Sequence, residues 1–377
     1  MKKIIIPALS MLALSATAAE PLLTYKNGPI SLSGLVLIDA GYTYTDNQAG
    51  GSEIDFQSGM QSPNLIGVSG SYAIDDKLSL IFNLENQFSL EDGKTIGDGI
   101  FSRQAWLGLD TAYGKLTFGK QYEFMFESLS QNRLGHKLSA VSLHQMQQGP
   151  FDNFILPGPI PGVPDIFHLD FNRISGAWRV DDSLKYVSPE FKGFTAGLMY
   201  GGDGVDYAGS KGNKSETKTS SAGINYKGSN LRANAAYTKS EDFLGLGSDI
   251  ENYGAGLAWD FGKHTFDAIY TKTKNLTNKG EIDVYGVGLN NALAKQVSMY
   301  TNFQYMDGNK ELKNRNAKQL GTTVLYHYSP NIDFYSSLVY QDASGDGGAQ
   351  ARIAAIAASS NDDSQLIARV GVRFLLY

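Results

Sequence analysis

The sequence contains no cysteine. Without thiols it can form no disulfide, no zinc–thiolate site and no cysteine nucleophile. A chain of 377 residues can bury enough surface to fold without disulfides. The sequence also has no cluster of basic residues, and its net charge is −6. Nucleic acid is therefore not an expected partner.

Long hydrophobic runs are missing after the N-terminus. The first residues combine Lys2 and Lys3 with the apolar run 4–14 and the small residues 16–19, which is the pattern of a secretory signal peptide. We expect residues 1–19 to be removed, leaving one domain over 20–377 with a net charge of about −8. Beyond residue 19, no apolar stretch reaches the roughly 18 residues that a membrane helix needs. Three classes stay open: a secreted all-β enzyme, an extracellular binding protein and a transmembrane β-barrel.

Motifs for catalysis and metal binding are scarce as well. The sequence has no His-Glu-x-x-His motif and no Gly-x-Ser-x-Gly nucleophile elbow. The five histidines are His136, His144, His168, His264 and His327. We interpret them as loop or rim residues rather than metal ligands. The sequence therefore predicts no catalytic residue, no metal and no cofactor.

What the chain does contain is apolar and polar residues in alternation, the period of a β-strand with one apolar face. From 366 to 374 every second residue is apolar, while Arg369 and Arg373 lie on the opposite face. Helical periodicity over eleven or more residues is hard to find. We predict sixteen strands, near residues 31–44, 62–74, 77–89, 101–110, 115–121, 177–188, 194–202, 219–228, 230–240, 250–260, 264–274, 281–290, 296–306, 318–328, 332–342 and 364–374.

The predicted connections alternate strictly between short turns and long loops. Seven short turns and eight long loops place all the long loops at one end of the sheet. Short turns at one end, longer loops at the other and an even strand count are typical of bacterial outer-membrane barrels, whereas a sandwich has no reason to sort its loops. The expected fold is an all-β, sixteen-stranded antiparallel transmembrane β-barrel.

One connection stands apart from the others. Residues 123–172 show no sustained helical or strand period and hold five of the eleven prolines. A run of that length inside a compact domain is either a sign of misassigned elements or a functional loop.

Several stretches resemble the trimeric general porins of Gram-negative bacteria. They are Arg103–Leu109, Gly114–Tyr122, Ser183–Tyr186, Ser188–Phe194, Gly34–Gly41 and Val370–Phe374. The resemblance implies a homotrimer of water-filled barrels in the outer membrane, surrounded by lipid and lipopolysaccharide. It implies passive diffusion of ions and small hydrophilic solutes, with a third loop folded into the lumen at the narrowest point. Residues 123–172 occupy the place of that loop. A substrate-selective channel and a surface adhesin or binding barrel are the alternatives.

Strand alternation assigns faces, since a charge on the lipid face at the bilayer midplane costs roughly 2–4 kcal/mol. Trp106 is expected to face lipid or a neighbouring subunit, which puts Arg103, Ala105 and Leu107 in the lumen. Glu85 and Gln87 are also expected to point inward. In the strand near 177–188, the expected inward residues are Arg179, Asp181, Ser183 and Lys185.

The resemblance further implies a ladder of basic wall residues set against acidic residues on the third loop. Arg103 and Arg179 fall at ladder positions, a third such position is Leu65, and Lys185 compensates in part. The acids available on the loop are Glu123, Glu127, Asp152, Asp165 and Asp170. Their excess over Arg133 and Lys137 predicts a mild preference for cations.

Lys120 shares its face with Leu116 and Phe118, so it is expected to point outward near a strand end. The resemblance implies that this region packs against the next subunit. We therefore predict that Lys120 meets Glu91 or Asp92 of a neighbouring second loop, or that it extends to the membrane interface. The last strand leaves one question open. Either it stops at Phe374, or a bulge resets its register before Tyr377.

Overall fold

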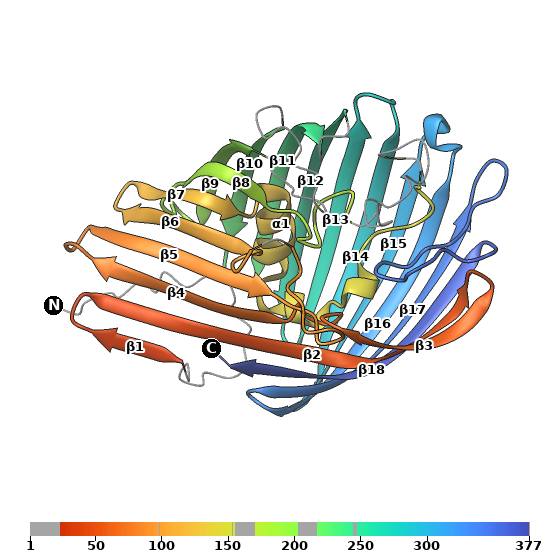
Figure 1. The fold of residues 1–377 in the computed structure, drawn as a ribbon, viewed down its shortest axis with the longest axis horizontal. Helices are drawn as coiled ribbons and strands as arrows, with labels where there is room; N and C mark the ends of the chain where they lie inside the picture. The colour runs from red at the N-terminus through yellow and green to blue at the C-terminus, as the bar shows by residue number, and fades with distance from the viewer. Residues whose placement is uncertain are drawn as a thin grey trace.

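The computed structural model describes residues 23–97, 99–152, 154, 170–202, 217–243 and 247–376. Within these residues, sixteen antiparallel strands close into a barrel, because the last strand, β18, pairs with β2 (Figure 1). The barrel strands are β2 (Ile30–Gln48), β4 (Leu65–Ala73), β5 (Leu78–Gln87), β6 (Gln104–Thr111), β7 (Gly114–Gln121), β8 (Val180–Val187), β9 (Phe194–Gly202), β10 (Lys218–Lys227), β11 (Leu231–Phe243), β12 (Ser248–Phe261), β13 (His264–Asn275), β14 (Glu281–Ala294), β15 (Val297–Gly308), β16 (Asn316–Ser329), β17 (Ile332–Ser344) and β18 (Ser364–Leu376). The predicted sixteen-stranded antiparallel β-barrel is confirmed.

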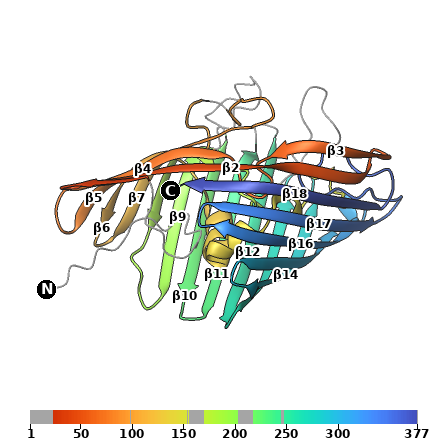
Figure 2. The same cartoon turned by 90° about the horizontal axis from the view of Figure 1, so that it is seen from below.

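Two further strands extend the wall beside β2. Strand β1 (Thr24–Asn27) forms a hairpin with the start of β2. Strand β3 (Gly51–Ser58) pairs with the second half of β2, while β4 pairs with its first half. The second wall position is thus shared by β3 and β4, which residues 59–64 separate (Figure 2). The prediction of a long loop over 45–61 was wrong, because the alternation of Ile54 and Phe56 continues the strand on the outer face.

The two faces of the wall differ in polarity. Large apolar side chains such as Leu198, Leu184 and Val370 are exposed on the outer face. Threonine, asparagine, glutamine and charged side chains alternate with them on the inner face, where many are buried. This is the pattern of a barrel whose outer surface contacts lipid.

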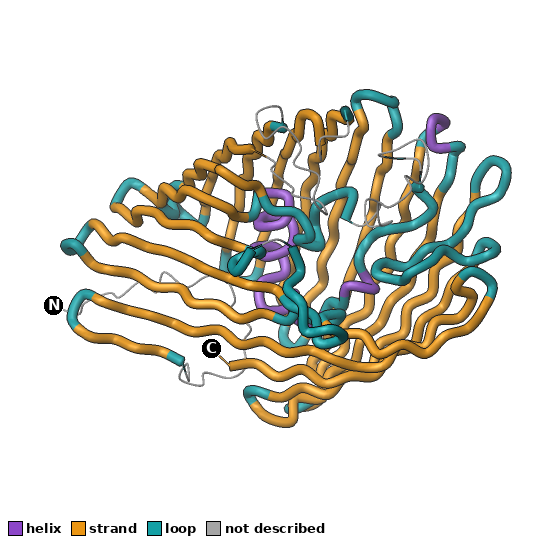
Figure 3. The backbone as a smooth tube through the Cα atoms, viewed as in Figure 1, coloured by secondary structure: helices purple, strands orange, loops and turns teal. Residues whose placement is uncertain are grey.

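The inner face is covered by segments that connect the strands. Residues 122–152 contain α1 (Phe124–Phe126), the π-helical turn η1 (Glu127–Asn132), and the 3-10 turns η2 (Gly135–Ala140) and η3 (Leu143–Gln145). A further 3-10 turn, η4 (Lys310–Leu312), lies between β15 and β16. The helical turns before β8 contact β10, β11, β12, β15 and β16, and Figure 3 draws the helices in purple among the strands. Short turns of this kind explain the lack of a sustained helical period in the sequence.

Strand β18 resolves the question of the C-terminal register. Its pairing with β2 runs without a shift from Leu366 to Leu376, so the strand does not stop at Phe374. Leu375 faces inward and packs with Leu37 and Leu65. The expected signal peptide and Tyr377 lie outside the described residues. No described helix is long and apolar enough to cross a membrane.

Candidate functional site

The candidate site is the interior of the barrel, where segment 122–152 meets the inner wall. The segment begins with α1, whose N-terminus is capped by Glu123. The Glu123 carboxylate accepts hydrogen bonds from Met125 N (2.6 Å) and Phe126 N (3.1 Å), and from the Thr238 hydroxyl on β11. Burial raises the pKa of the Glu123 carboxyl, while Arg173 opposes that effect.

Lys185 of β8 joins the wall to this segment. Its ammonium forms an ion pair with Glu127, donates to Tyr122 O at 2.8 Å and lies 4.8 Å from the centre of the Phe124 ring. The sequence-based assignment of Lys185 to the inner face agrees with this position. The pair brings a predicted wall base and a predicted loop acid into direct contact.

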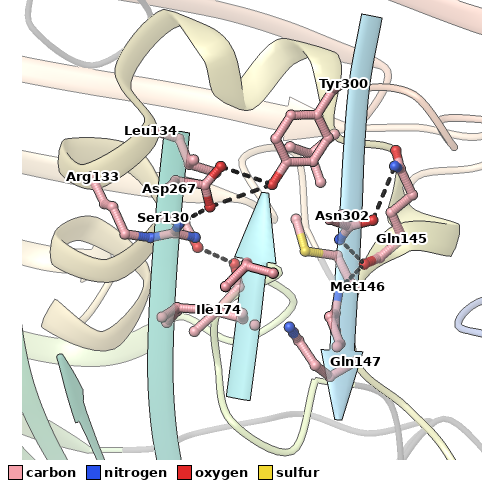
Figure 4. Close-up of a pocket in the computed structure, with 15 residues that line it drawn as sticks. Ser130, Arg133, Leu134, Gln145, Met146, Gln147, Ile174, Asp267, Tyr300 and Asn302 are labelled. Carbon is pink, nitrogen blue, oxygen red and sulfur yellow. Dashed lines mark hydrogen bonds and ion pairs between the residues drawn. The ribbon is translucent and has the colours of Figure 1, made fainter. Parts of the chain in front are cut away.

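A second ion pair anchors the segment farther along, and Figure 4 shows it beside a small cavity. Arg133 pairs with Asp267 of β13 and donates through Nε to Leu129 O at 2.6 Å. The Tyr300 hydroxyl of β15 donates to the other Asp267 oxygen at 3.2 Å. Beside this cluster lies a cavity of about 20 Å³ lined by Gln147 and Gln304 among others, room for about one water molecule.

Gln145 provides the next set of contacts. Its side-chain amide donates to Asn302 of β15 (3.2 Å) and accepts from Thr323 of β16 (2.8 Å). Its backbone oxygen accepts from Asn302 and Gln304. Because these bonds reach two neighbouring strands, the segment follows the wall instead of standing free of it.

Asp170 organises the return of the chain toward β8. Its carboxylate accepts from Ser175 N (2.7 Å) and Ala177 N (2.9 Å), and Asp170 itself has a left-handed backbone with φ of 61°. Burial raises the pKa of this carboxyl to about 6. Asp170 therefore stabilises a tight turn, and its carboxylate is not exposed to a solvent path.

Three of the remaining predicted charged residues, Arg103, Glu85 and Arg179, come together at the start of β6. Arg103 lies beside Glu85, with 3.8 Å between Nε and the carboxylate, and also donates to Gln87. The guanidinium groups of Arg103 and Arg179 lie 5.5 and 6.0 Å from the centre of the Tyr122 ring. Arg179 donates to the backbone oxygens of residues 176 and 177.

The face assigned to Trp106 was wrong. Trp106 lies opposite Asn83 on the inner face and donates to Gln104 at 3.3 Å, whereas Leu107 is 49% exposed on the outer face. The prediction took Trp106 to face outward because of its size, and the alternation then put Arg103, Ala105 and Leu107 in the lumen. Arg103 precedes the first strand residue, so its side chain is not bound by the strand's alternation. The assignment of Ala105 and Leu107 to the lumen was wrong because it followed from the face given to Trp106.

Lys120 points outward, as predicted, but its ion-pair partner in this chain is Asp181, at 3.0 Å. The inward assignment of Asp181 was wrong. The register between β8 and β9 shifts after Asp181, and Asp182 has a left-handed φ of 48°, so the alternation breaks there. Glu91 accepts from Ser58 N, and Asp92 pairs with Lys94. The contact of Lys120 with Glu91 or Asp92 of a neighbouring subunit stays a prediction.

Two of the predicted loop acids, Asp152 and Asp165, remain to be placed. Asp152 lies 3.8 Å from Arg315, and Asp165 is not among the described residues. Glu123, Glu127, Asp152 and Asp170 are thus each buried or in contact with a base or backbone donor. These four carboxylates, from which the cation preference was predicted, therefore form contacts within the protein.

Sequence reasoning missed a second interior segment, residues 349–360. Ile353 and Ile356 pack against Val339 and Ile367 on the inner face. The ring nitrogen of His144 lies 2.7 Å from Ala354 O, which joins this segment to η3, and burial lowers the pKa of His144 to about 4. The signal was present in the run of alanines and isoleucines at 349–358, which is unusually apolar for an exposed loop.

Sequence reasoning also missed a buried network of hydrogen bonds and an ion pair that joins β2 and β18, the first and last strands of the barrel. Arg369 of β18 lies 3.7 Å from Asp39 of β2 and donates to the Tyr335 hydroxyl (3.0 Å), which in turn donates to Asp39 (2.7 Å). Asp39 also accepts from Gln61 N in the segment that separates β3 from β4. The alternation had already placed Arg369 on the polar face. Its acidic partner, 330 positions earlier in the chain, is visible only once the barrel is closed.

The comparisons with known proteins agree with this architecture. A model of the Gram-negative porin family matches residues 7–346. The chain belongs to the Gram-negative porin family. This porin is 25% identical to outer membrane porin protein 32 of Delftia acidovorans, over 73% of this chain and 70% of that one. It is 26% identical to an outer membrane porin protein of Bordetella pertussis over 53% of this chain, and the match spans about half (48%) of that relative.

Solved structures show the same fold. The anion-selective porin from Comamonas acidovorans has a TM-score of 0.72 at 17% identity, with 92% of this porin and 99% of that chain covered. The trimer form of OmpT from Vibrio cholerae has a TM-score of 0.63 at 16% identity, with 92% and 100% covered. The family and the fold together show that this protein is an outer-membrane porin, a channel for the passive diffusion of solutes.

Proposed function

We propose that this porin passes ions and small hydrophilic solutes down their gradients without catalysing a reaction, and that loop 123–172 limits their size. The observation that supports this most directly is the set of contacts between segment 122–152 and the inner faces of β8, β11, β13, β15 and β16. A segment held at so many points narrows the solvent path by a fixed amount, and such narrowing is how pores select by size.

The burial of the inner face supports a narrow path. Inner residues such as Thr219, Thr273 and Gln341 are fully buried, although an unobstructed lumen would leave them in contact with water. Segment 349–360 adds to this cover on β17 and β18. We therefore propose a small conductance for a sixteen-stranded barrel.

Planar-bilayer recording with size-graded uncharged solutes tests the proposal. We expect small, uniform single-channel steps and a low size limit. Absence of steps from correctly folded protein would contradict the channel function and favour an adhesin. A conductance block that saturates with one sugar, peptide or acid would favour the substrate-selective alternative.

We further propose that charge selectivity is weak. The excess of loop acids gave the sequence-based expectation of cation preference, but Glu127 pairs with Lys185 and Asp152 lies beside Arg315. Charges that neutralise one another within a few ångströms produce little field in the path. A reversal potential close to zero in a salt gradient is expected, and a strongly cation-selective or anion-selective value would contradict this.

A homotrimer in the outer membrane is the proposed assembly, supported by the trimer form of the Vibrio cholerae relative. The apolar outer face provides surface for both lipid and subunit contacts. Lipopolysaccharide is the proposed partner at the loop end. Electrophoresis of unheated protein, with and without chemical cross-linking, tests the trimer, and a monomer under both conditions would contradict it.

A further inference from the structure

Several inner-face glycines lie directly beneath side chains of segment 122–152. They are Gly197 on β9, Gly223 on β10, Gly256 on β12 and Gly321 on β16. None of the four has the left-handed φ that would by itself require glycine. We call these four residues the glycine seam. Their shared feature is that a Cβ atom at each would collide with the loop.

Gly223 shows the relationship most directly. A Cβ there would lie 2.6 Å from Ser128 Oγ, 2.7 Å from Phe124 Cδ1 and 2.8 Å from Phe124 Cβ. All three atoms belong to the loop, and none belongs to a neighbouring strand. Phe124 and Ser128 are both buried, so neither side chain has free space to move into.

The other seam residues contact later parts of the segment. A Cβ at Gly197 would overlap the tip of the Phe124 ring and would also lie 2.8 Å from Tyr186 O of β8. One at Gly256 would lie 2.5 Å from Arg133 Cδ, and one at Gly321 would lie 2.7 Å from Gln145 Cγ. Arg133 and Gln145 are the residues that bond the segment to β13, β15 and β16. The loop is therefore hydrogen-bonded to the wall and also packs directly against the wall backbone at the glycines.

We propose that the glycine seam sets how far the loop projects from the wall and thereby sets the size limit of the channel. The seam residues act by positioning the loop, since they are covered by it. An added methyl group must push the loop away from the wall, toward the space through which solutes pass, because close-packed interiors have no slack to absorb it. This inference rests on the proposed role of loop 123–172 in limiting solute size.

The test compares Gly223→Ala with Gly202→Ala, a strand glycine where an added Cβ would make ordinary contacts at 3.8 and 3.9 Å. We expect Gly223→Ala to lower the single-channel conductance by roughly a fifth or more and to lower the size limit, since both follow the cross-section of the path. Gly202→Ala is expected to match the wild type. Folding is checked by the shift in electrophoretic mobility on heating.

A compensating pair separates loop positioning from general damage to the fold. Gly197→Ala is expected to lower the conductance. Adding Phe124→Leu, which lacks the ring tip, is expected to restore part of the loss, because the added Cβ still lies 2.8 Å from Tyr186 O of β8. If Gly223→Ala does not fold, Gly256→Ala and Gly321→Ala test the same seam on other strands. Folded seam variants with wild-type conductance and size limit would overturn the proposal. A wild-type protein without channel steps would instead contradict the proposed function.

Discussion

Lys185 and Glu127 form an ion pair in which both side chains are almost fully buried, with exposed fractions of 3% and 7%. One belongs to the wall and the other to the loop. The same ammonium donates to Tyr122 O and lies over the Phe124 ring. The contact therefore fixes the beginning of the loop to β8.

Removing one partner of this pair should release the beginning of the loop. Lys185→Met leaves Glu127 as an uncompensated buried charge, which typically costs about 3–5 kcal/mol. We expect faster hydrogen exchange over residues 122–132 and noisier single-channel currents. Lys115→Met is a matched control, since the Lys115–Asp110 pair is about a third exposed and should contribute less than about 1 kcal/mol. The double variant Lys185→Met/Glu127→Leu is expected to recover part of the loss, and no recovery would contradict the pairing.

Asp267 should matter more than Tyr300 for the second attachment point. Asp267→Asn removes the charge that faces the buried Arg133 guanidinium, so we expect a loss of about 3 kcal/mol or more in the stability of the folded loop. Tyr300→Phe removes one hydrogen bond, worth about 1 kcal/mol. Chemical denaturation of the refolded barrel and hydrogen exchange over residues 129–147 measure both effects. Equal losses in the two variants would argue against the ion pair as the main contribution.

The network at the barrel closure gives a separate prediction, for Arg369 and for the residues 59–64 that Asp39 holds. Arg369→Met leaves the Asp39 carboxylate buried with the Tyr335 hydroxyl and Gln61 N as donors, and we expect a loss of about 3–5 kcal/mol in barrel stability. Residues 59–64 should exchange faster, because Asp39 holds them. Unfolding in urea measures the first effect and hydrogen exchange the second. A barrel as stable as the wild type would show that the network is dispensable.

Asp170 and His144 should give the loop opposite responses to acid. The pKa of Asp170 is raised to about 6 from 3.8, so the folded loop binds its proton more tightly and is favoured as the pH falls through 6. The pKa of His144 is lowered to about 4 from 6.5, so the folded loop is disfavoured as the pH falls below 6.5. The two effects oppose each other in nearly the same interval.

Single variants should therefore reveal a pH dependence that the wild type partly hides. Relative to the wild type, Asp170→Asn should lose loop stability as the pH falls from about 6 to 4. His144→Gln should gain loop stability as the pH falls from 6.5 to about 4. Glu123, whose pKa is also raised, is unchanged in both variants. Channel closure rates and denaturation at several pH values measure the difference. The same pH response in both variants would rule out this assignment.

Much of this architecture is determined locally in the sequence. Outer and inner residues alternate within each strand, and turns interleave with loops, so the strands could be placed to within a few residues from 194 onward. The same alternation put Glu85, Lys185 and Arg369 on the inner face. It failed in β6, where the large Trp106 was taken to face lipid, and at Asp181, beside a left-handed residue. The face of Trp106 is set by strand pairing and that of Asp181 by a break in the backbone, and residue type reveals neither.

Which charged side chains pair with one another, by contrast, was decided by the tertiary structure alone. Lys185 meets Glu127, Arg133 meets Asp267 and Arg369 meets Asp39 because barrel closure and loop return bring distant residues together. The pairing of two charged side chains depends on the strand register and on which side chains face the barrel interior. Neither can be inferred from the sequence next to the two residues. The sequence by itself determined a polar inner face and a long third loop. The closed barrel decided that the charges on that loop would be neutralised against the wall, at positions where inner-face glycines leave room for it.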